Sequence, residues 1–464
     1  MQTFPRLTAV FGVPVAELTA ASIDRAIANQ VPEAGDLDWK QMLYPDTSEG
    51  RGELAKDVAA LANASGGILV LGVQEDGSSR ASASTPVAVS NSETERMQKI
   101  CQHLVRPFLP GVKVRPLHLA PTSGYYVIVV PRSPDAPHAV VNGNKGHLLS
   151  YPLRDEATTR WLGEGEIAAR YRDRYASRAE NGAALDRAHA EGVARLTTGR
   201  PWIAVSLHPS VPAYRASGAH VLAAIDGFVS SWVQYFAPPT GPFIGSKKVA
   251  PGVRRAMVTG ADDYRGSASE YPHAELHYNG AGFAASPVLT IDDSGALSAV
   301  VEQNGQSARI PQDLMEFYLF GLISLLAHHA VNSGAANDCE LQAQLVLPKF
   351  PANERISRSS EMYGPVSWSE GSVMDEYERV REALPLATQG TPTRITMNLD
   401  ELVSSPRMVV SAAYTLATDI LGEFAIANPC VLRSDGYLDL SRTMKGRRAE
   451  FAQWAKKHHL LDLP

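Results

Sequence analysis

The chain has 464 residues, of which 44% are hydrophobic and 20% charged, and this composition is typical of a soluble globular protein with room for two or three domains. The net charge is −6, yet residues 1–200 hold 22 basic and 22 acidic residues, so the negative excess lies entirely in the remainder. Bulk charge therefore does not predict nucleic-acid binding, which would need a local basic stripe.

The first predicted elements follow the order strand, helix, strand. A short helix is expected at 19–29 and a strand at 37–43. Apolar residues then recur at helical spacing over 54–62, and the pair Gly66-Gly67 ends that helix. Residues 68–73 are continuously apolar, which is typical of a strand covered on both faces.

The remaining elements of the first domain are a helix, two strands, short extended pieces and a closing helix. They are expected at 92–108, 112–119, 125–130, 133–141, 146–154 and 164–178. We place this first α/β domain at 1–180, followed by a helical linker at 181–200.

A second domain with another pattern is predicted at 201–464. Strands are expected at 202–207, 274–300, 342–347 and 394–399, and helices at 217–236, 314–331, 409–427 and 444–459. This mixture predicts an α+β domain of unknown fold. If the first domain is a nuclease, we expect this second domain to act as its sensor or regulator.

Cysteine usage and the apolar segments indicate the compartment. Cys101, Cys339 and Cys430 are too far apart for a CxxC metal knuckle and do not make an even disulfide set, which favours reducing cytoplasm. The most apolar run, 314–331, contains Glu316 and two histidines, so we expect a buried core helix and no membrane association.

Three acidic residues and a lysine lie where strands are predicted to begin or end. They occur in Glu33-Ala-Gly-Asp-Leu-Asp38-Trp-Lys40 and in the segment that ends Gly72-Val-Gln-Glu75-Asp76. If the two strands pair, the carboxylates meet at one edge of the sheet. Carboxylate oxygens bind hard cations such as Mg²⁺ or Mn²⁺, and a nearby lysine neutralises charge on a phosphate. Taken alone, acids at strand ends are more often simply solvated.

The spacing of these residues resembles the AlbA-type domain of the Schlafen family. The similar segment covers about residues 20–175 and includes Asn63, Gly66-Gly67, Pro137-His138-Ala-Val and Tyr151-Pro-Leu-Arg154. The resemblance implies an AlbA-like fold, and in some family members RNA-cutting activity on tRNA and rRNA.

Carried over by position, the resemblance implies catalytic and metal-binding roles for Glu33, Asp38 and Glu75, with Lys40 facing the phosphate and Asp76 as the alternative to Glu75. Asp38 stands where the family has Glu, and Glu75 where it has Asp, so the charge is retained but the reach differs by one methylene. The Cys/His set that binds zinc in animal Schlafens is missing, so no zinc is expected.

A basic stripe is expected on the helix at 164–178. Arg170, Arg174 and Arg178 are spaced four residues apart and share a face, with Tyr171 and Tyr175 beside them. Arginines can hold phosphates while tyrosines stack on bases. A solvated face with tyrosines packed on the core is an equally good interpretation.

Another polar pattern occurs in the second domain. His273, Glu275 and His277 alternate on one face of a predicted strand, as metal ligands do, but an exposed polar face is commoner.

Two main functional hypotheses follow. The first is a metal-dependent endoribonuclease of Schlafen type, acting on structured RNA such as tRNA, which by family analogy suits bacterial anti-phage defence. The second is a non-catalytic regulator that binds DNA or RNA with the same domain, and nucleotide binding by this domain is a third. Because one lobe with balanced charge offers a short basic track, we also expect a homodimer or larger homo-oligomer.

Overall fold

The computed structural model describes most of the chain, and the chain divides into two compact units, Met1–Glu180 and Asn181–Pro464. The described residues are 4–141, 149–196, 201–213, 219–239, 241–243, 246–261, 271–288, 290–291, 297–298, 308–347, 366–369, 390–424, 426–443 and 448–462. Both units mix helices and strands, which confirms the predicted α+β class.

The N-terminal unit is built on a sheet in which β1 pairs with β2, and β2 with β8, while β5 and β7 also pair with β8. The bounds are β1 Leu37–Lys40, β2 Gly67–Leu71, β5 Val87–Ala88, β7 Lys113–Ala120 and β8 Ser123–Val130. β1 and β2 are parallel, and helix α3 (Ser48–Asn63) connects them. The two strands predicted to be neighbours are therefore neighbours.

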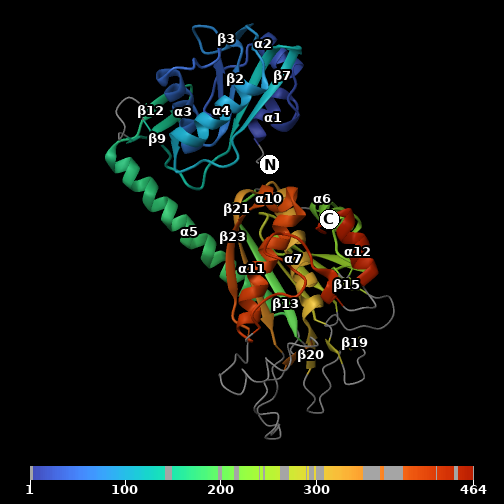
Figure 1. Cartoon of the computed structure of the whole chain (residues 1–464). Coiled ribbons are helices and arrows are strands. Elements are labelled where there is room, and N and C mark those ends of the chain that lie inside the picture. Colours follow the sequence, from blue (N-terminus) through green and yellow to red (C-terminus); the bar gives the residue numbers. More distant parts are fainter. Residues whose placement is uncertain are drawn as a thin grey trace. The chain divides into compact units, whose positions relative to one another are not determined.

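Helices cover both faces of this sheet (Figure 1). On one face, Leu69 and Leu71 of β2 join the core under α3 and α4 (Asn91–Leu104). On the other, Ile68 and Val70 pack with α1 (Pro5–Phe11) and α2 (Ala20–Ala28). The continuous apolar run of β2 is thus buried on both sides, as predicted.

Short strands complete the unit. β3 (Val73–Glu75) pairs with β4 (Ala81–Ser84), β9 (Ala139–Val141) with β6 (Val105–Arg106) and β10 (Leu149–Ser150), and β11 (Pro152–Asp155) with β12 (Thr158–Trp161).

Helix α5 runs from Glu164 to Val193 and is longer than the predicted helix. The predicted linker at 181–200 is therefore helical as far as Val193, and 197–200 lie outside the described residues. Gly192 lies against the ring of Phe283, where an added Cβ would come within 2.3 Å of a ring carbon. This glycine lets the end of α5 lie close to the sheet of the C-terminal unit.

The C-terminal unit contains a seven-stranded antiparallel sheet. Its order is β14-β15-β16-β17-β13-β21-β23. The bounds are β13 Trp202–Val211, β14 Ser246–Gly252, β15 Arg255–Ala261, β16 His273–His277, β17 Gly282–Pro287, β21 Ala336–Val346 and β23 Thr393–Asn398. The pair β14 and β15 was not anticipated. A smaller sheet is formed by β18 (Thr290–Ile291), β19 (Leu297–Ser298), β20 (Ala308–Pro311) and β22 (Val366–Ser369).

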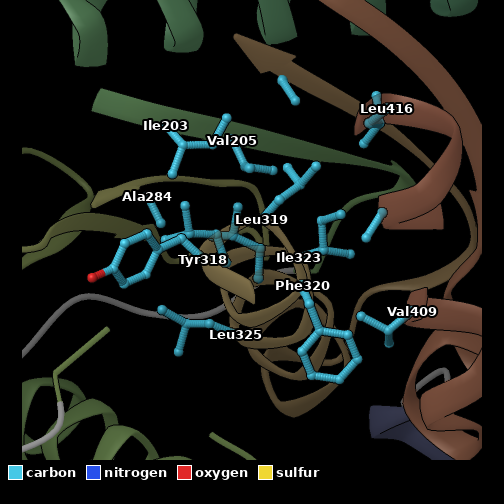
Figure 2. Close-up of a cluster of buried hydrophobic side chains, with 14 of the residues drawn as sticks. Ile203, Val205, Ala284, Tyr318, Leu319, Phe320, Ile323, Leu325, Val409 and Leu416 are labelled. Atoms are coloured by element: carbon cyan, nitrogen blue, oxygen red, sulfur yellow. The ribbon is translucent and has the colours of Figure 1, made fainter. Parts of the chain in front are cut away.

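Among the described residues, five helices accompany the large sheet. They are α6 Ala219–Tyr235, α7 Gln312–Ser333, α10 Leu399–Ser404, α11 Pro406–Gly422 and α12 Arg448–Lys457, so part of the helix predicted at 444–459, residues 444–447, lies outside the described residues. Figure 2 shows Ile203 and Val205 of β13 beside Leu319 and Ile323 of α7 in the main core, which also holds Val409.

Helix α7 is the one described helix that is long and apolar enough to cross a membrane by length and composition, and 89% of its most apolar window is buried inside the unit. It is therefore the central core helix that the sequence predicted. The buried carboxylate of Glu316 accepts hydrogen bonds from the backbone N–H groups of Cys430, Val431 and Leu432.

Candidate functional site

Strand β1 places its acid and its lysine on the face that α3 covers. Leu37 and Trp39 point into the core beneath α1 and α2. Because side chains alternate along a strand, Asp38 and Lys40 point to the other face, in register with Leu69 and Leu71 of β2. The local pattern apolar, acid, aromatic, lysine is thus what brings two charged groups beside α3.

Glu33 reaches this cluster from the turn before β1. Its Oε1 accepts a hydrogen bond of 2.8 Å from the backbone N–H of Trp39. The turn itself is tied to the β3–β4 hairpin, because the Glu33 N–H donates to the carbonyl of Ser79 at 2.7 Å.

Arg154 of β11 bridges the two acids. Its Nη2 lies 3.1 Å from Oε2 of Glu33, and its Nη1 lies 3.0 Å from Oδ1 of Asp38. All three side chains are at least 94% buried. From the sequence, Arg154 was recognised only as part of the family signature, and no spacing signal assigned it to the site.

Lys40 and α3 extend the cluster. Nζ of Lys40 lies 2.7 Å from Oδ2 of Asp38, and one third of its side chain is exposed. On α3, Asp57 accepts a 2.6 Å hydrogen bond from the hydroxyl of Tyr44, and Nζ of Lys56 lies 3.6 Å from its other oxygen. Asp57 and Tyr44 are site residues that sequence reasoning missed, because a buried polar residue on a helix leaves no mark in apolar spacing.

The two bridged acids have opposite pKa shifts. Burial, then the hydrogen bond and charge of Asp38, raise the pKa of Glu33 from 4.5 to about 8. Burial also opposes ionisation of Asp38, but the charges of Lys40 and Arg154 outweigh it and hold its pKa below the usual value. Interacting carboxyls whose pKa values are driven apart are characteristic of a pair that shares one proton.

Asp57 on α3 interacts electrostatically with Asp38 and Lys40. Burial and the charge of Asp38 raise the pKa of Asp57. For Lys40, the charges of Asp38 and Asp57 outweigh burial and raise its pKa. Glu33, Asp38, Lys40 and Asp57 therefore form one electrostatic unit, and such clusters of perturbed groups are frequent at functional sites.

The third predicted acid does not belong to this cluster. Gly72, with φ of +100°, turns the chain out of β2, and Glu75 is exposed on β3, whose partner is β4. The neighbouring Asp76 is also exposed and caps a turn through the N–H groups of Ser78 and Arg80. Among the described residues no three acids are placed to hold one ion, so the structure does not bring Glu33, Asp38 and Glu75 together as the predicted metal site, since pairing of β1 with β2 does not govern the chain beyond Gly72.

The arrangement also does not fit the predicted magnesium or manganese ion. In the described part of the chain, no three His, Cys, Asp or Glu side chains are placed so that they could hold a metal ion. The four oxygens of Glu33 and Asp38 already contact Trp39 N–H, Arg154 and Lys40.

The predicted arginine stripe faces the N-terminal unit. Arg170 donates to the carbonyl of Asn63 at 2.7 Å, while Arg174 and Arg178 both pair with Asp135. The hydroxyl of Tyr171 lies 3.3 Å from that of Tyr151. Arg178 and Tyr175 remain largely exposed, at 55% and 62%. The face is thus mostly used in packing, which corrects the expectation of a free basic stripe.

Of the alternating residues His273, Glu275 and His277 on β16, Glu275 forms buried ion pairs. Glu275 is 1% exposed, and its two oxygens lie 2.7 Å from Arg195 and 3.1 Å from Arg255. Glu275 therefore ties the end of α5 and strand β15 to β16. The sequence allowed a metal ligand or an exposed polar face, and Glu275 is neither.

Comparison with known proteins gives one informative match. Residues 33–160 match the family model described as Schlafen, AlbA_2. The match begins at Glu33 and includes β1, α3, β11 and Arg154, so it spans the whole charged cluster. It indicates a nucleic-acid-binding or nuclease-like function for this part of the chain.

The other comparisons add little. No curated protein sequence is significantly similar to the chain. Among solved structures, the DIP2311 protein from Corynebacterium diphtheriae is 15% identical over 38% of this chain and 34% of that protein, with a TM-score of 0.23.

Proposed function

We propose, since residues 33–160 form an AlbA_2 domain of Schlafen type, that the N-terminal unit binds nucleic acid, above all structured RNA such as tRNA, beside β1 and α3. One observation carries the proposal. The acidic side chains of the cluster are buried and paired with cations or hydrogen-bond donors, whereas the side chains of Lys40 and Lys56 are 33% and 23% exposed. The groups that a phosphate can reach are therefore the cations.

The buried acids support binding by fixing these cations in place. Asp38 holds Nζ of Lys40, and Asp57 lies beside Lys56. A lysine that is already positioned loses less side-chain freedom when a phosphate arrives. A phosphate that pairs with Lys40 also releases counterions, so binding should weaken as salt rises.

The binding experiment compares Lys40→Gln with Lys99→Gln, which removes an exposed lysine on α4. Labelled tRNA and a DNA duplex are titrated over a range of salt concentrations. We expect Lys40→Gln to bind tRNA several-fold more weakly and with a smaller salt slope, by about 0.7–0.9 for each phosphate that the variant no longer neutralises. Equal affinity and slope in wild type and Lys40→Gln would refute this location for the site, and a preference for DNA would overturn the choice of RNA.

RNA cleavage is the second candidate, and the raised pKa of Glu33 favours it. A carboxyl with a pKa of about 8 retains its proton near neutral pH and can give it to a leaving oxygen, while Arg154 and Lys40 offset negative charge nearby. Glu33 must become accessible for this, since its side chain is 4% exposed.

Cleavage is tested on tRNA with wild type and Glu33→Gln, in Mn²⁺ and in EDTA. Cleavage by wild type and its loss in Glu33→Gln would establish the nuclease, and the EDTA arm decides whether it depends on a metal. Intact tRNA under every condition would leave the chain as a nucleic-acid-binding protein, with no role in defence through RNA cutting.

A further inference from the structure

Each oxygen of the acid pair lies beside an N–H donor or a cation, and Oδ2 of Asp38 has its ion-pair contact with Lys40 but no hydrogen bond. Oε1 of Glu33 is bonded to the Trp39 N–H, and Oε2 to Arg154. Oδ1 of Asp38 contacts Arg154, and Oδ2 contacts Lys40. An ion that takes these oxygens as ligands would compete with these contacts and would lie against the charges of Arg154 and Lys40.

Backbone carbonyl groups also hold the Arg154 side chain in this position. Its Nε donates to the carbonyl of Glu156 at 2.9 Å, in the turn between β11 and β12, and its Nη2 lies 3.5 Å from the carbonyl of Leu37. The side chain is 6% exposed. A guanidinium is planar, stays charged at all accessible pH values and has a fixed fork of donors, so it is suited to join two carboxylates permanently.

The charges around the pair are already matched. Glu33 and Asp38 together carry at most two negative charges. Arg154 and Lys40 supply two positive charges at contact distance. A divalent cation would add two more positive charges beside them, and among the described residues no third His, Cys, Asp or Glu is placed to bind such an ion together with these two acids.

We propose that Arg154 is the resident cation of the Glu33–Asp38 pair and that this site works without a bound divalent metal ion. The guanidinium joins the two carboxylates where a metal ion would otherwise join them. This assignment deepens the proposed function: its relevance to RNA depends on the N-terminal unit binding RNA. Its test uses the metal ion alone, so failure of this assignment and failure of RNA binding are separately visible.

The experiment measures Mn²⁺ binding by the full chain, from the loss of the free-ion signal in electron paramagnetic resonance and from thermal unfolding in Mn²⁺ and in EDTA. Wild type should neither bind Mn²⁺ at this site nor change its melting temperature. Arg154→Ala should acquire Mn²⁺ binding and Mn²⁺-dependent stability, because it leaves two buried carboxyls without their counter-ion. Arg154→Lys should remain largely insensitive.

The control combines Arg154→Ala with Glu33→Gln and Asp38→Asn, and should lose the acquired binding. If Arg154→Ala does not fold in EDTA, folding on addition of Mn²⁺ is the expected result. Two results would overturn the proposal: Mn²⁺ binding by wild type that Glu33→Gln with Asp38→Asn abolishes, and an Arg154→Ala chain that neither binds Mn²⁺ nor is rescued by it.

Discussion

At the scale of single residues, the charged cluster consists of polar groups that are buried only because each has a partner. Asp38 is 1% exposed and is held by Arg154 and Lys40. Burying an ion without such partners costs several kcal/mol, so removal of one partner harms the protein more than replacement of the whole set. The cluster is for this reason fragile to single substitutions and sensitive to pH.

Glu33 should make the stability of the N-terminal unit depend on pH. Its pKa rises from 4.5 to about 8 on folding, so the folded chain keeps a proton that the unfolded chain loses in this window. The contribution of Glu33 to the free energy of unfolding is therefore fully present below pH 4.5 and is lost as the pH rises towards 8. Each unit of pKa difference corresponds to about 1.4 kcal/mol.

Glu33→Gln mimics the protonated form and should flatten this dependence. The measurement is urea unfolding at several pH values in the window, with the exposed Glu17→Gln as the control. Parallel stability profiles for wild type and Glu33→Gln would contradict the raised pKa.

Asn63 at the end of α3 should be a stability residue of the same unit. Its amide nitrogen donates to the carbonyls of His138 and Pro152, both at 2.8 Å, and its oxygen accepts from the His138 N–H at 2.6 Å. Asn63→Ala leaves three buried groups unpaired and should cost on the order of 3 kcal/mol.

Asn63→Asp should cost more than Asn63→Ala, since a carboxylate would face two carbonyl oxygens. The free energy of unfolding from urea titration measures both changes, and the exposed Gln102→Ala on α4 should change it by less than about 0.5 kcal/mol. A fully stable Asn63→Asp chain would show that the amide is not needed.

At the scale of elements, the entry into β2 depends on two glycines. Gly66 has φ of +73°, the left-handed conformation predicted for the end of α3. A Cβ on Gly66 would come within 2.5 Å of the Arg132 nitrogen, and one on Gly67 within 2.4 Å of the Asp36 carbonyl oxygen. Both glycines are therefore structural, because the chain has no room for a side chain where β2 begins.

Gly66→Ala should destabilise the N-terminal unit by about 2 kcal/mol or more, since strain and a backbone clash act together. Gly52→Ala in α3 is the matched control, because nothing lies within 4 Å of its added Cβ. In a helix this change should be neutral or stabilising by up to about 1 kcal/mol. Thermal unfolding compares the two, and equal melting temperatures would contradict the structural role of Gly66.

At the scale of the whole molecule, the short basic surface favours assembly. Arg174 and Arg178 are paired with Asp135, which leaves few cations of α5 for phosphate. Few phosphate contacts give weak binding, and a second copy doubles them. We therefore retain the prediction of a homodimer or larger homo-oligomer.

Light scattering at micromolar concentration tests the assembly against the chain mass of 50.0 kDa. A mass of twice this value or more is expected with RNA, and RNA affinity should fall on dilution below the dimer dissociation constant. A strict monomer with and without RNA would refute the assembly and leave the binding proposal to be judged by Lys40→Gln.

The sequence by itself determined the local arrangement and the domain type. The acid, tryptophan and lysine of β1, the glycine pair and the apolar run of β2 predicted two neighbouring strands joined by a helix, and the structure shows that they pair in parallel. Residues 33–160 match the Schlafen AlbA_2 family model. It also predicted α7 as a buried core helix. These features are determined by periodicity and turn chemistry, which act over a few residues.

Only the tertiary structure decided which charged groups meet. Arg154 is 116 residues from Asp38 in the chain, and Asp57 comes from the buried side of α3. Glu75, by contrast, stands next to a strand of the site in sequence but turns away at Gly72. Ion pairs depend on distances in space across separate elements, and no pattern along the chain records those distances.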